Sequence, residues 1–256
     1  MKNPSDIHEL DWLRELFLEL DKFADPIMGI RDWDDAVCVE TNGTKLIASC
    51  DGPYKKRLVM KSALLHAATD VIIKGAKPLF ALDTLTGPDR EVREMAESLK
   101  RQSKYLELPI LGGNTMIEYC ESTASIFVIG KLETENPIRD SSAKKGDVIA
   151  VIGEPFWGTQ KERFDRAREL LPVWYEIVQK VRINASKDIT KGGLMATVRE
   201  VGEKSGLKPT LIDELPFHRT RNLDNFLITT DKDQYPKIEK ICTKGRVSAV
   251  KIGEMK

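Results

Sequence analysis

The chain has 256 residues, and 41% of them are apolar, which is close to the usual share in globular proteins. Forty lysine and arginine residues balance forty aspartate and glutamate residues, so the net charge does not indicate a nucleic acid or an acidic membrane as partner. The sequence has no uncharged apolar stretch of about 18 residues, and its polar N-terminus is unlike a signal peptide. The four cysteines are widely spaced without a CxxC pair, so we expect a cytoplasmic protein without disulfides or structural zinc.

The first half of the chain is predicted to mix helices and strands. The Asn42-Gly43 pair is typical of a hairpin turn between two strands. Glycine at position 75 followed by Pro78 is a common stop signal for a helix. From apolar periodicity we expect a helix at 8–23, strands at 36–40 and 45–50, a helix at 57–74, a strand at 79–85, a helix at 89–105, and strands at 108–111 and 125–132.

The second half shows the same mixture after a break in the apolar pattern. Residues 136–146 contain Pro137, serines and lysines, so we place a domain boundary there, with domains at 1–138 and 139–256. Beyond the boundary we expect a strand at 147–153, helices at 161–181 and 190–204, a strand at 226–230, a helix at 235–242 and a strand at 247–252.

The predicted helix at 57–74 carries an unusual polar stripe. Its sides are apolar, yet Ser62, His66, Asp70 and Lys74 follow one another at intervals of four, which stacks them on one face. This stripe either meets solvent, with Asp70 and Lys74 paired one turn apart, or lines a site. The sequence leaves both interpretations open.

Aspartates lie at the ends of the first two predicted strands. Asp34 and Asp35 precede one strand, and Asp51 follows the next. Carboxylates in such places commonly hold Mg²⁺, which takes oxygen ligands and bridges to phosphates. The alternative for each is an ordinary turn aspartate.

Two glycine-rich segments are candidates for binding phosphate. Gly112-Gly113-Asn114-Thr115 follows a predicted strand, so its main-chain amides can approach an anion, although an ordinary turn explains it equally well. In residues 187–194, Asp188 or Thr190 caps the following helix, or the first amides of that helix form an anion site with Lys187 and Lys191. The sequence contains no Walker A, GxGxxG or GxSxG motif.

The order of these segments resembles a known superfamily of ATP-binding proteins. It includes aminoimidazole ribotide synthetase, thiamine-monophosphate kinase, selenophosphate synthetase and the hydrogenase maturation protein HypE. Residues 70–78 and 188–194 are the most specific matches, and the resemblance extends over about residues 34–254. It implies a two-domain α/β (α+β) fold of the PurM-like type, whose N-terminal domain pairs with its twin in a homodimer. ATP would bind near the dimer interface.

The resemblance also implies roles for individual residues. Mg²⁺ would be held at the positions of Asp35, Asp51 and Asp70, with Asp34 assisting. Gly112 and Gly113, followed by Asn114 and Thr115, would face the phosphates, which Lys61 and Lys191 would neutralise. Asp188 would contact metal or substrate, and His66 is a candidate to orient a ligand or to act as acid or base.

The chain departs from the family pattern at several points. Asn114 replaces an acidic residue, Trp33 replaces a glycine, and the region from 211 to 225 lacks a segment. No cysteine precedes Cys38, as a selenophosphate synthetase would need, and the chain does not end in the cysteine of HypE. We therefore expect an orphan member of the synthetase-related group.

The sequence leaves two functions open. The first is an ATP- and Mg²⁺-dependent phosphotransferase or synthetase that activates a small metabolite. The second is a nucleotide-binding regulator or assembly partner without turnover. The retained aspartates favour the enzyme, whereas Asn114 and the short C-terminal half favour the regulator. A relative of the same fold without a nucleotide site is a third alternative.

Overall fold

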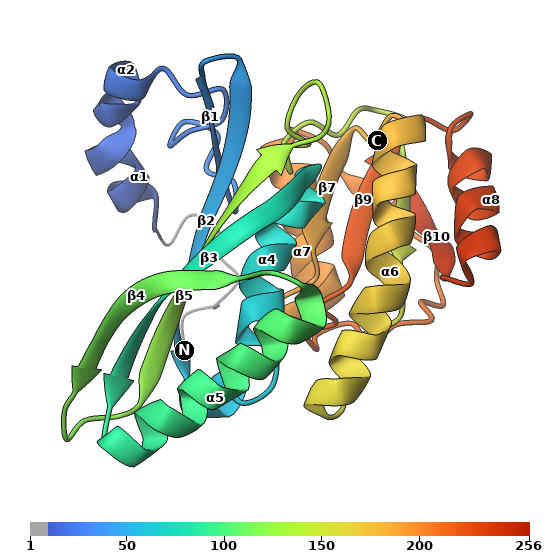
Figure 1. The fold of residues 1–256 in the computed structure, drawn as a ribbon. Coiled ribbons are helices and arrows are strands. Elements are labelled where there is room, and N and C mark those ends of the chain that lie inside the picture. The colour runs from blue at the N-terminus through green and yellow to red at the C-terminus, as the bar shows by residue number, and fades with distance from the viewer. Residues whose placement is uncertain (1–9) are drawn as a thin grey trace.

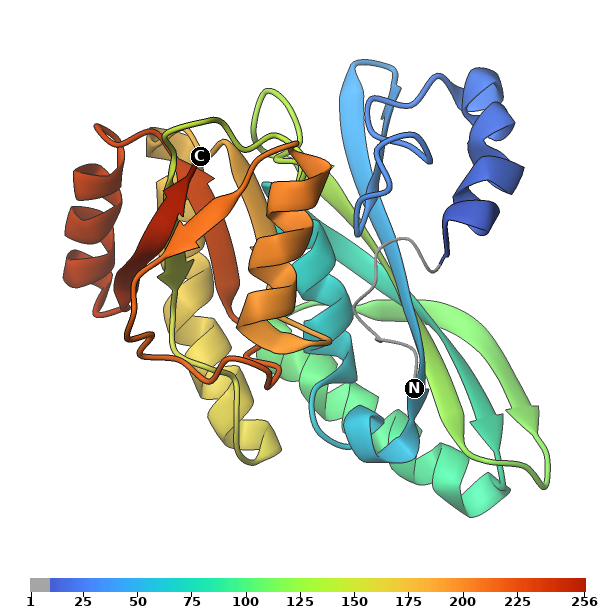
Figure 2. The same ribbon diagram turned by 180° about the vertical axis from the view of Figure 1, so that it is seen from behind.

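The computed structural model describes residues 10–256 and places them in two five-stranded sheets with helices around and between them (Figures 1 and 2). The strand order is β1-β2-β5-β3-β4 in the first sheet and β7-β9-β6-β10-β8 in the second. Among the described residues, no helix is long and apolar enough to span a membrane. The elements are α1 (Asp11–Phe17), η2 (Leu18–Leu20), α2 (Asp21–Ala24), β1 (Val37–Thr41), β2 (Thr44–Lys55), α3 (Lys56–Val59), α4 (Ala63–Ile73), β3 (Ala76–Gly87), α5 (Asp89–Leu106), β4 (Ile110–Ile117), β5 (Thr123–Leu132), β6 (Val148–Ile152), α6 (Gln160–Lys180), β7 (Ala185–Asp188), α7 (Gly193–Lys204), β8 (Pro209–Leu211), β9 (Phe226–Thr230), α8 (Tyr235–Gly245) and β10 (Ala249–Met255).

The first sheet is antiparallel except for β3 and β4, which run parallel and are connected by α5. The β1–β2 hairpin turns at Asn42 and Gly43, whose φ angles of 50° and 73° are those that an Asn-Gly turn adopts. Helix α4 packs on β2, β5 and β3. Alternate residues of β5 are buried under it, while the residues between them remain partly exposed. The sheet therefore has one covered face and one open face.

The second sheet is antiparallel throughout and is covered on both faces. Alternate residues of β6 belong to different cores. Val148, Ala150 and Ile152 pack in a cluster with α6 and α8, whereas Ile149 and Val151 pack in a second cluster with α7. This alternation explains why all five residues of β6 are buried and why β6 is apolar throughout.

The two halves share one hydrophobic core. Helix α4 is buried over most of its length, because it packs on the first sheet and also against β7 of the second half (Figure 1). Trp174 of α6 is fully buried, packs edge-on against Phe226 at 5.1 Å and donates a hydrogen bond to the carbonyl of Ile72 at 2.8 Å. Residues of α4 and β7 are therefore held in fixed positions relative to one another.

Several predicted elements differ from the observed ones. The helix predicted at 57–74 is broken into α3 and α4, because the chain leaves helical geometry at Ser62, where φ is −159°. The predicted helix at 8–23 begins outside the described residues and continues as α1, η2 and α2. The predicted strand at 45–50 extends to Lys55, so Asp51 lies within β2 rather than after it.

Two strands of the second sheet were not predicted. They are β7, which is short and largely polar in sequence, and β8, which has only three residues of mixed character. The glycine-rich segment 112–115 also differs from expectation, since it lies inside β4 instead of in a loop after a strand. The boundary expected between residues 138 and 139 falls between the last strand of the first sheet and the first strand of the second. Domains at 1–138 and 139–256 remain our proposal.

Candidate functional site

Three aspartates from distant parts of the chain converge between the two halves. Asp35 precedes β1, Asp70 lies in α4, and Asp188 ends β7. One carboxylate oxygen of each lies within 4.8 Å of the others. We call these three residues the aspartate triad. Carboxylates at such short distances repel one another when ionised, and a shared cation relieves that repulsion.

The surroundings of the triad disfavour ionisation of two of its members. Loss of water contact raises the pKa of Asp70 well above its ordinary value, and the charges of Asp188, Asp35 and Asp51 raise it further. A hydrogen bond of 2.9 Å from the Ser49 hydroxyl acts in the opposite direction. Burial, followed by the charge of Asp35, raises the pKa of Asp188 to about 7. Without a cation, the carboxyl groups of Asp70 and Asp188 therefore favour the protonated form, and a bound cation would favour their ionisation.

Asp35 is the member of the triad that has a counter-ion. Burial opposes its ionisation, but Lys187 outweighs that effect, with help from Lys74 and Lys204, and the pKa of Asp35 lies below its usual range. The ammonium of Lys187 is 2.5 Å from both carboxylate oxygens of Asp35. It also lies 3.5 Å from Glu200 and 3.7 Å from Asp140.

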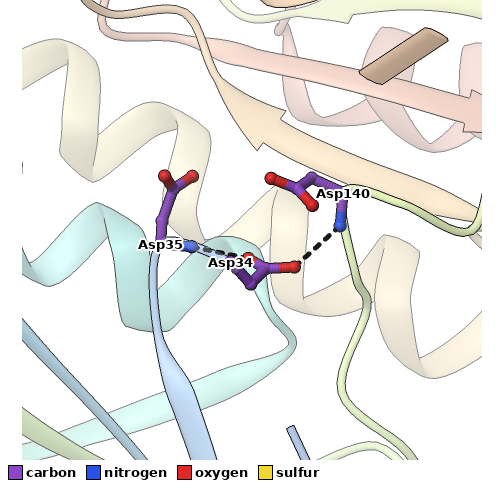
Figure 3. A group of neighbouring side chains, drawn as sticks. All are labelled: Asp34, Asp35 and Asp140. Atoms are coloured by element: carbon purple, nitrogen blue, oxygen red, sulfur yellow. Dashed lines mark hydrogen bonds between the residues drawn. The ribbon is translucent and has the colours of Figure 1, made fainter. Parts of the chain in front are cut away.

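Asp34 belongs to a neighbouring group with Asp35 and Asp140, whose carboxylate oxygens also lie within 4.8 Å of one another (Figure 3). It accepts hydrogen bonds from the main-chain N–H groups of Asp35 at 2.8 Å and Asp140 at 2.9 Å (Figure 3). Its carboxylate is also 2.5 Å from the ammonium of Lys74, and both side chains are fully buried. These contacts hold the start of β1 against the segment that enters the second half. Its expected part in metal binding remains a prediction.

The polar stripe on α4 lines this region and is not a solvated face. Ser62 and Lys74 are buried, and the side chain of His66 is only 15% exposed. Lys74 pairs with Asp34, so the alternative of an Asp70–Lys74 pair on the surface is wrong.

Asp51 and His66 lie beside the triad without belonging to it. Asp51 accepts hydrogen bonds from the Tyr54 hydroxyl and from the N–H of Gly52, and its charge raises the pKa of Asp70. The Nδ1 atom of His66 is 3.6 Å from Asp224, and its charge lowers the pKa of Asp188. Both residues can therefore influence whatever the triad binds.

The remaining predicted residues are not brought to the triad within one copy of the chain. Gly112, Gly113, Asn114 and Thr115 are exposed in the edge strand β4. Strand register aligns Gly113 with Asp83, Ile126 and Asp51 in turn. Gly113 is therefore three strand spacings, or roughly 14 Å, from Asp51. Gly113 must be glycine, because a Cβ atom there would lie 2.1 Å from the carbonyl oxygen of Asp83.

Lys61 and Lys191 lie in the turns before α4 and α7. Within residues 10–256, neither side chain makes a hydrogen bond or an ion pair, so both ammonium groups are available. Their expected contacts with phosphates stay predictions.

Four residues with direct roles at the site had no clear signal in the sequence. The sequence indicates Lys187 only as an anion-binding residue and gives no indication of Ser49, Asp140 or Asp224. A lysine next to an aspartate in a polar tetrapeptide gives no indication of burial. Only the packing of β7 against α4 places Lys187 beside Asp35.

Comparison with known proteins identifies the family. Residues 30–132 match the model of the N-terminal domain of AIR synthase related proteins. The chain is 34% identical to an uncharacterized protein of Methanocaldococcus jannaschii over 97% of its own length and 84% of the other. The chain belongs to the AIR synthase-related superfamily. This confirms the resemblance and the two-domain PurM-like α/β fold class.

Other members of the family are named enzymes. The chain is 30% identical to the selenide, water dikinase of Caldanaerobacter subterraneus over 71% of its length, but it spans only 59% of that enzyme. The structure of thiamine monophosphate kinase from Aquifex aeolicus matches with a TM-score of 0.67 and 20% identity, covering 98% of this chain and 95% of the other. A structure of ThiL with AMPPCP and TMP matches with a TM-score of 0.65 and 20% identity, covering 94% and 89%. These structural matches show the fold.

The residues present fit a divalent cation. The triad offers three carboxylates, and the raised pKa values of Asp70 and Asp188 indicate that their negative charge is poorly neutralised. Hard cations such as Mg²⁺ prefer oxygen ligands of this kind. The site is therefore suited to a divalent metal ion.

Proposed function

We propose that this protein is an ATP- and Mg²⁺-dependent phosphotransferase or synthetase that activates a small metabolite. The observation that carries the proposal is the convergence of Asp35, Asp70 and Asp188. Related proteins that are named kinases, and the binding of AMPPCP by ThiL, support the choice of a nucleotide substrate.

In this proposal the triad would hold Mg²⁺, with Asp51 close by. The ion, when bound, neutralises charge on the phosphate oxygens. Lys61 and Lys191, whose ammonium groups have no partner within residues 10–256, would bind the same phosphates. His66, whose Nδ1 atom is 3.6 Å from Asp224 and whose charge acts on Asp188, would hold or transfer a proton of the acceptor substrate.

We also propose a homodimer formed through the open face of the first sheet. On that face, strand pairing places apolar residues of neighbouring strands side by side in two rows across the sheet. Exposed large apolar side chains of this sheet include Val37, Leu79, Leu82, Leu111, Met116 and Ile117. Burying such a surface is favourable. A twin chain would also place a second β4 near each triad, which accounts for the distance of Gly112–Thr115 from the triad of their own chain.

A nucleotide-binding regulator without turnover is the second candidate function. Two observations favour it: Asn114 offers no charge in β4, and Lys187 already neutralises Asp35. The four cysteines are free thiols, which fits the cytoplasmic location proposed for either function.

The test is nucleotide binding and ADP formation with the purified full chain. Titration of ATP with and without Mg²⁺ measures binding, and ADP release with small phosphorylated and carboxylated metabolites measures turnover. Asp70→Asn should abolish Mg²⁺-dependent binding. Asp165→Asn, a matched change in an exposed ion pair on α6, should bind as the wild type does.

The outcomes separate the candidates. ADP formation that disappears with Asp70→Asn supports the enzyme. Mg²⁺-dependent ATP binding without ADP from any substrate supports the regulator. If Asp70→Asn binds Mg²⁺ and ATP as tightly as the wild type, the triad is not the metal site and both proposals fail.

A further inference from the structure

Lys187 is the one cation in ion-pair contact with the triad among the described residues. Its ammonium lies 2.5 Å from both oxygens of Asp35, while Asp70 and Asp188 make no ion pair within residues 10–256. The Lys187 side chain is 6% exposed and that of Asp35 is 27% exposed, so water screens this contact only in part. A lysine ammonium therefore lies where it competes with a metal ion for Asp35.

Two other carboxylates lie near the same ammonium. Glu200 is 3.5 Å away and Asp140 is 3.7 Å away, which is beyond good hydrogen-bond distance. Asp140 is fully buried, and its Oδ1 atom has no hydrogen-bond partner in the part of the chain that is described. Buried carboxylate oxygens without a partner are rare, because each loses its hydration without compensation. Lys187 thus has a second set of acceptors, in which Asp140 Oδ1 has no partner, while Asp140 Oδ2 and Glu200 Oε1 already pair with Lys204.

We propose that Lys187 is the resident counter-ion of Asp35 in the metal-free protein and moves to Asp140 and Glu200 when a divalent cation binds the triad. This inference rests on the proposed function, because it assumes that the triad binds a metal ion. A displacement of roughly 1 Å brings the ammonium into hydrogen-bond range of Asp140 and Glu200. Lysine suits this movement, since its ammonium is a compact charge on a flexible stem.

The position of Lys187 affects how tightly the triad binds a metal ion. Lys187 competes with the cation for Asp35, so it lowers the affinity of the empty triad for a free divalent ion. A nucleotide brings additional phosphate charge and shifts the competition toward the metal. The site therefore binds metal together with nucleotide in preference to metal alone.

Lys204 keeps the second set of acceptors in place. Its ammonium lies 2.8 Å from Asp140 and 3.0 Å from Glu200, and it also donates to the carbonyl of Trp33 at 2.6 Å. Asp140 and Glu200 are thus held beside Lys187 whether or not it contacts them closely. The movement requires no rearrangement of the main chain.

The experiment measures Mn²⁺ binding to the full chain without nucleotide, from the loss of the free-ion signal in electron paramagnetic resonance. The variants are Lys187→Met, Glu200→Gln and the double variant, with Asp70→Asn to report the triad. Lys232→Met is the matched control, because it removes an equal charge from a surface pair with Glu254. Thermal unfolding of each variant with and without Mn²⁺ gives a second readout.

We expect Lys187→Met to bind Mn²⁺ at least about tenfold more tightly than the wild type and to unfold at lower temperature without metal. Glu200→Gln should bind severalfold more weakly, because Lys187 then has fewer alternative partners. In the double variant the effect of Glu200→Gln should disappear, as a double-mutant cycle requires if Glu200 acts through Lys187. Lys232→Met should bind as the wild type does.

Other results overturn the inference. If Lys187→Met leaves Mn²⁺ affinity unchanged or weakens it, or if the two substitutions act additively, Lys187 does not compete with the metal. Should Lys187→Met fail to fold, an unchanged affinity in Glu200→Gln alone refutes the movement. Loss of Mn²⁺ binding in Asp70→Asn shows that the triad is a metal site even when the Lys187 inference fails. Absence of Mn²⁺ and Mg²⁺-nucleotide binding in every form refutes the proposed function itself.

Discussion

Asp188→Asn should change how the stability of the metal-free protein depends on pH. Asp188 is 2% exposed, and burial with the charge of Asp35 raises its pKa from 3.8 to about 7. His66 and Lys187 lower this pKa, and Asp224 raises it. The folded protein therefore holds a proton on Asp188 between about pH 4 and pH 7, where the unfolded chain has lost it. Stability accordingly falls as pH rises through this interval.

The change in the free energy of unfolding follows from the pKa shift of Asp188. One pKa unit corresponds to about 1.4 kcal/mol, so a shift of roughly three units destabilises the fully ionised form by about 4 kcal/mol. Of this, roughly 3 kcal/mol is lost between pH 5 and pH 8. Asparagine resembles the protonated acid and does not titrate, so Asp188→Asn should escape this loss. Its stability relative to the wild type should rise by up to roughly 3 kcal/mol from pH 5 to pH 8.

Urea unfolding in a metal chelator at pH 5 and pH 8 measures both free energies of unfolding. Titrating groups that Asp188 does not perturb, such as Asp140, cancel in the difference. The pKa of Asp70 should be less strongly raised in the variant, because the charge of Asp188 is absent. Adding Mg²⁺ at pH 8 should stabilise the wild type and not the variant, because the metal binds the ionised triad. Equal losses of stability in wild type and variant between pH 5 and pH 8 would refute the reasoning.

Two further substitutions test the buried contacts. Lys74→Met should lower the free energy of unfolding, measured by urea titration, by about 3–5 kcal/mol, because it leaves the buried carboxylate of Asp34 without its cation. A loss below about 1 kcal/mol would contradict this account. Gly113→Ala should destabilise the β3–β4 edge, since its Cβ atom would lie 2.1 Å from the Asp83 carbonyl oxygen, and hydrogen exchange in β4 should accelerate. Gly146→Ala is the control, because no atom lies within 4 Å of the added carbon, although the φ of 91° at Gly146 adds backbone strain. Equal hydrogen exchange of β4 in the wild type and Gly113→Ala would refute the steric argument.

Most of the regular structure followed from local patterns. The amphipathic helices α5 and α6, the Asn42-Gly43 hairpin and the buried strands β6 and β9 all lie close to their predicted ranges. Each has a periodic or turn signal contained within a few residues. The strands β7 and β8 lack such a signal, because only three or four polar or mixed residues define each of them. They are strands because neighbouring strands pair with them.

The candidate site likewise contains residues that the sequence indicated and ion pairs that it did not. Sequence order indicated Asp35, Asp70 and Asp188 as candidates, and the fold brings their carboxylates together. The sequence did not indicate that Asp34 is neutralised by Lys74 or that Lys187 is the partner of Asp35. Partners separated by 40 to 152 residues depend on which elements pack together, and no local pattern encodes that.

The sequence by itself determined the element types, the family and the acidic character of the site, because these depend on residue chemistry and spacing along the chain. Tertiary structure alone decided which carboxylates share the space between α4 and β7 and which lysine balances them. The physical reason is that Coulomb energy depends on distance and burial, and both are set when the two sheets enclose α4.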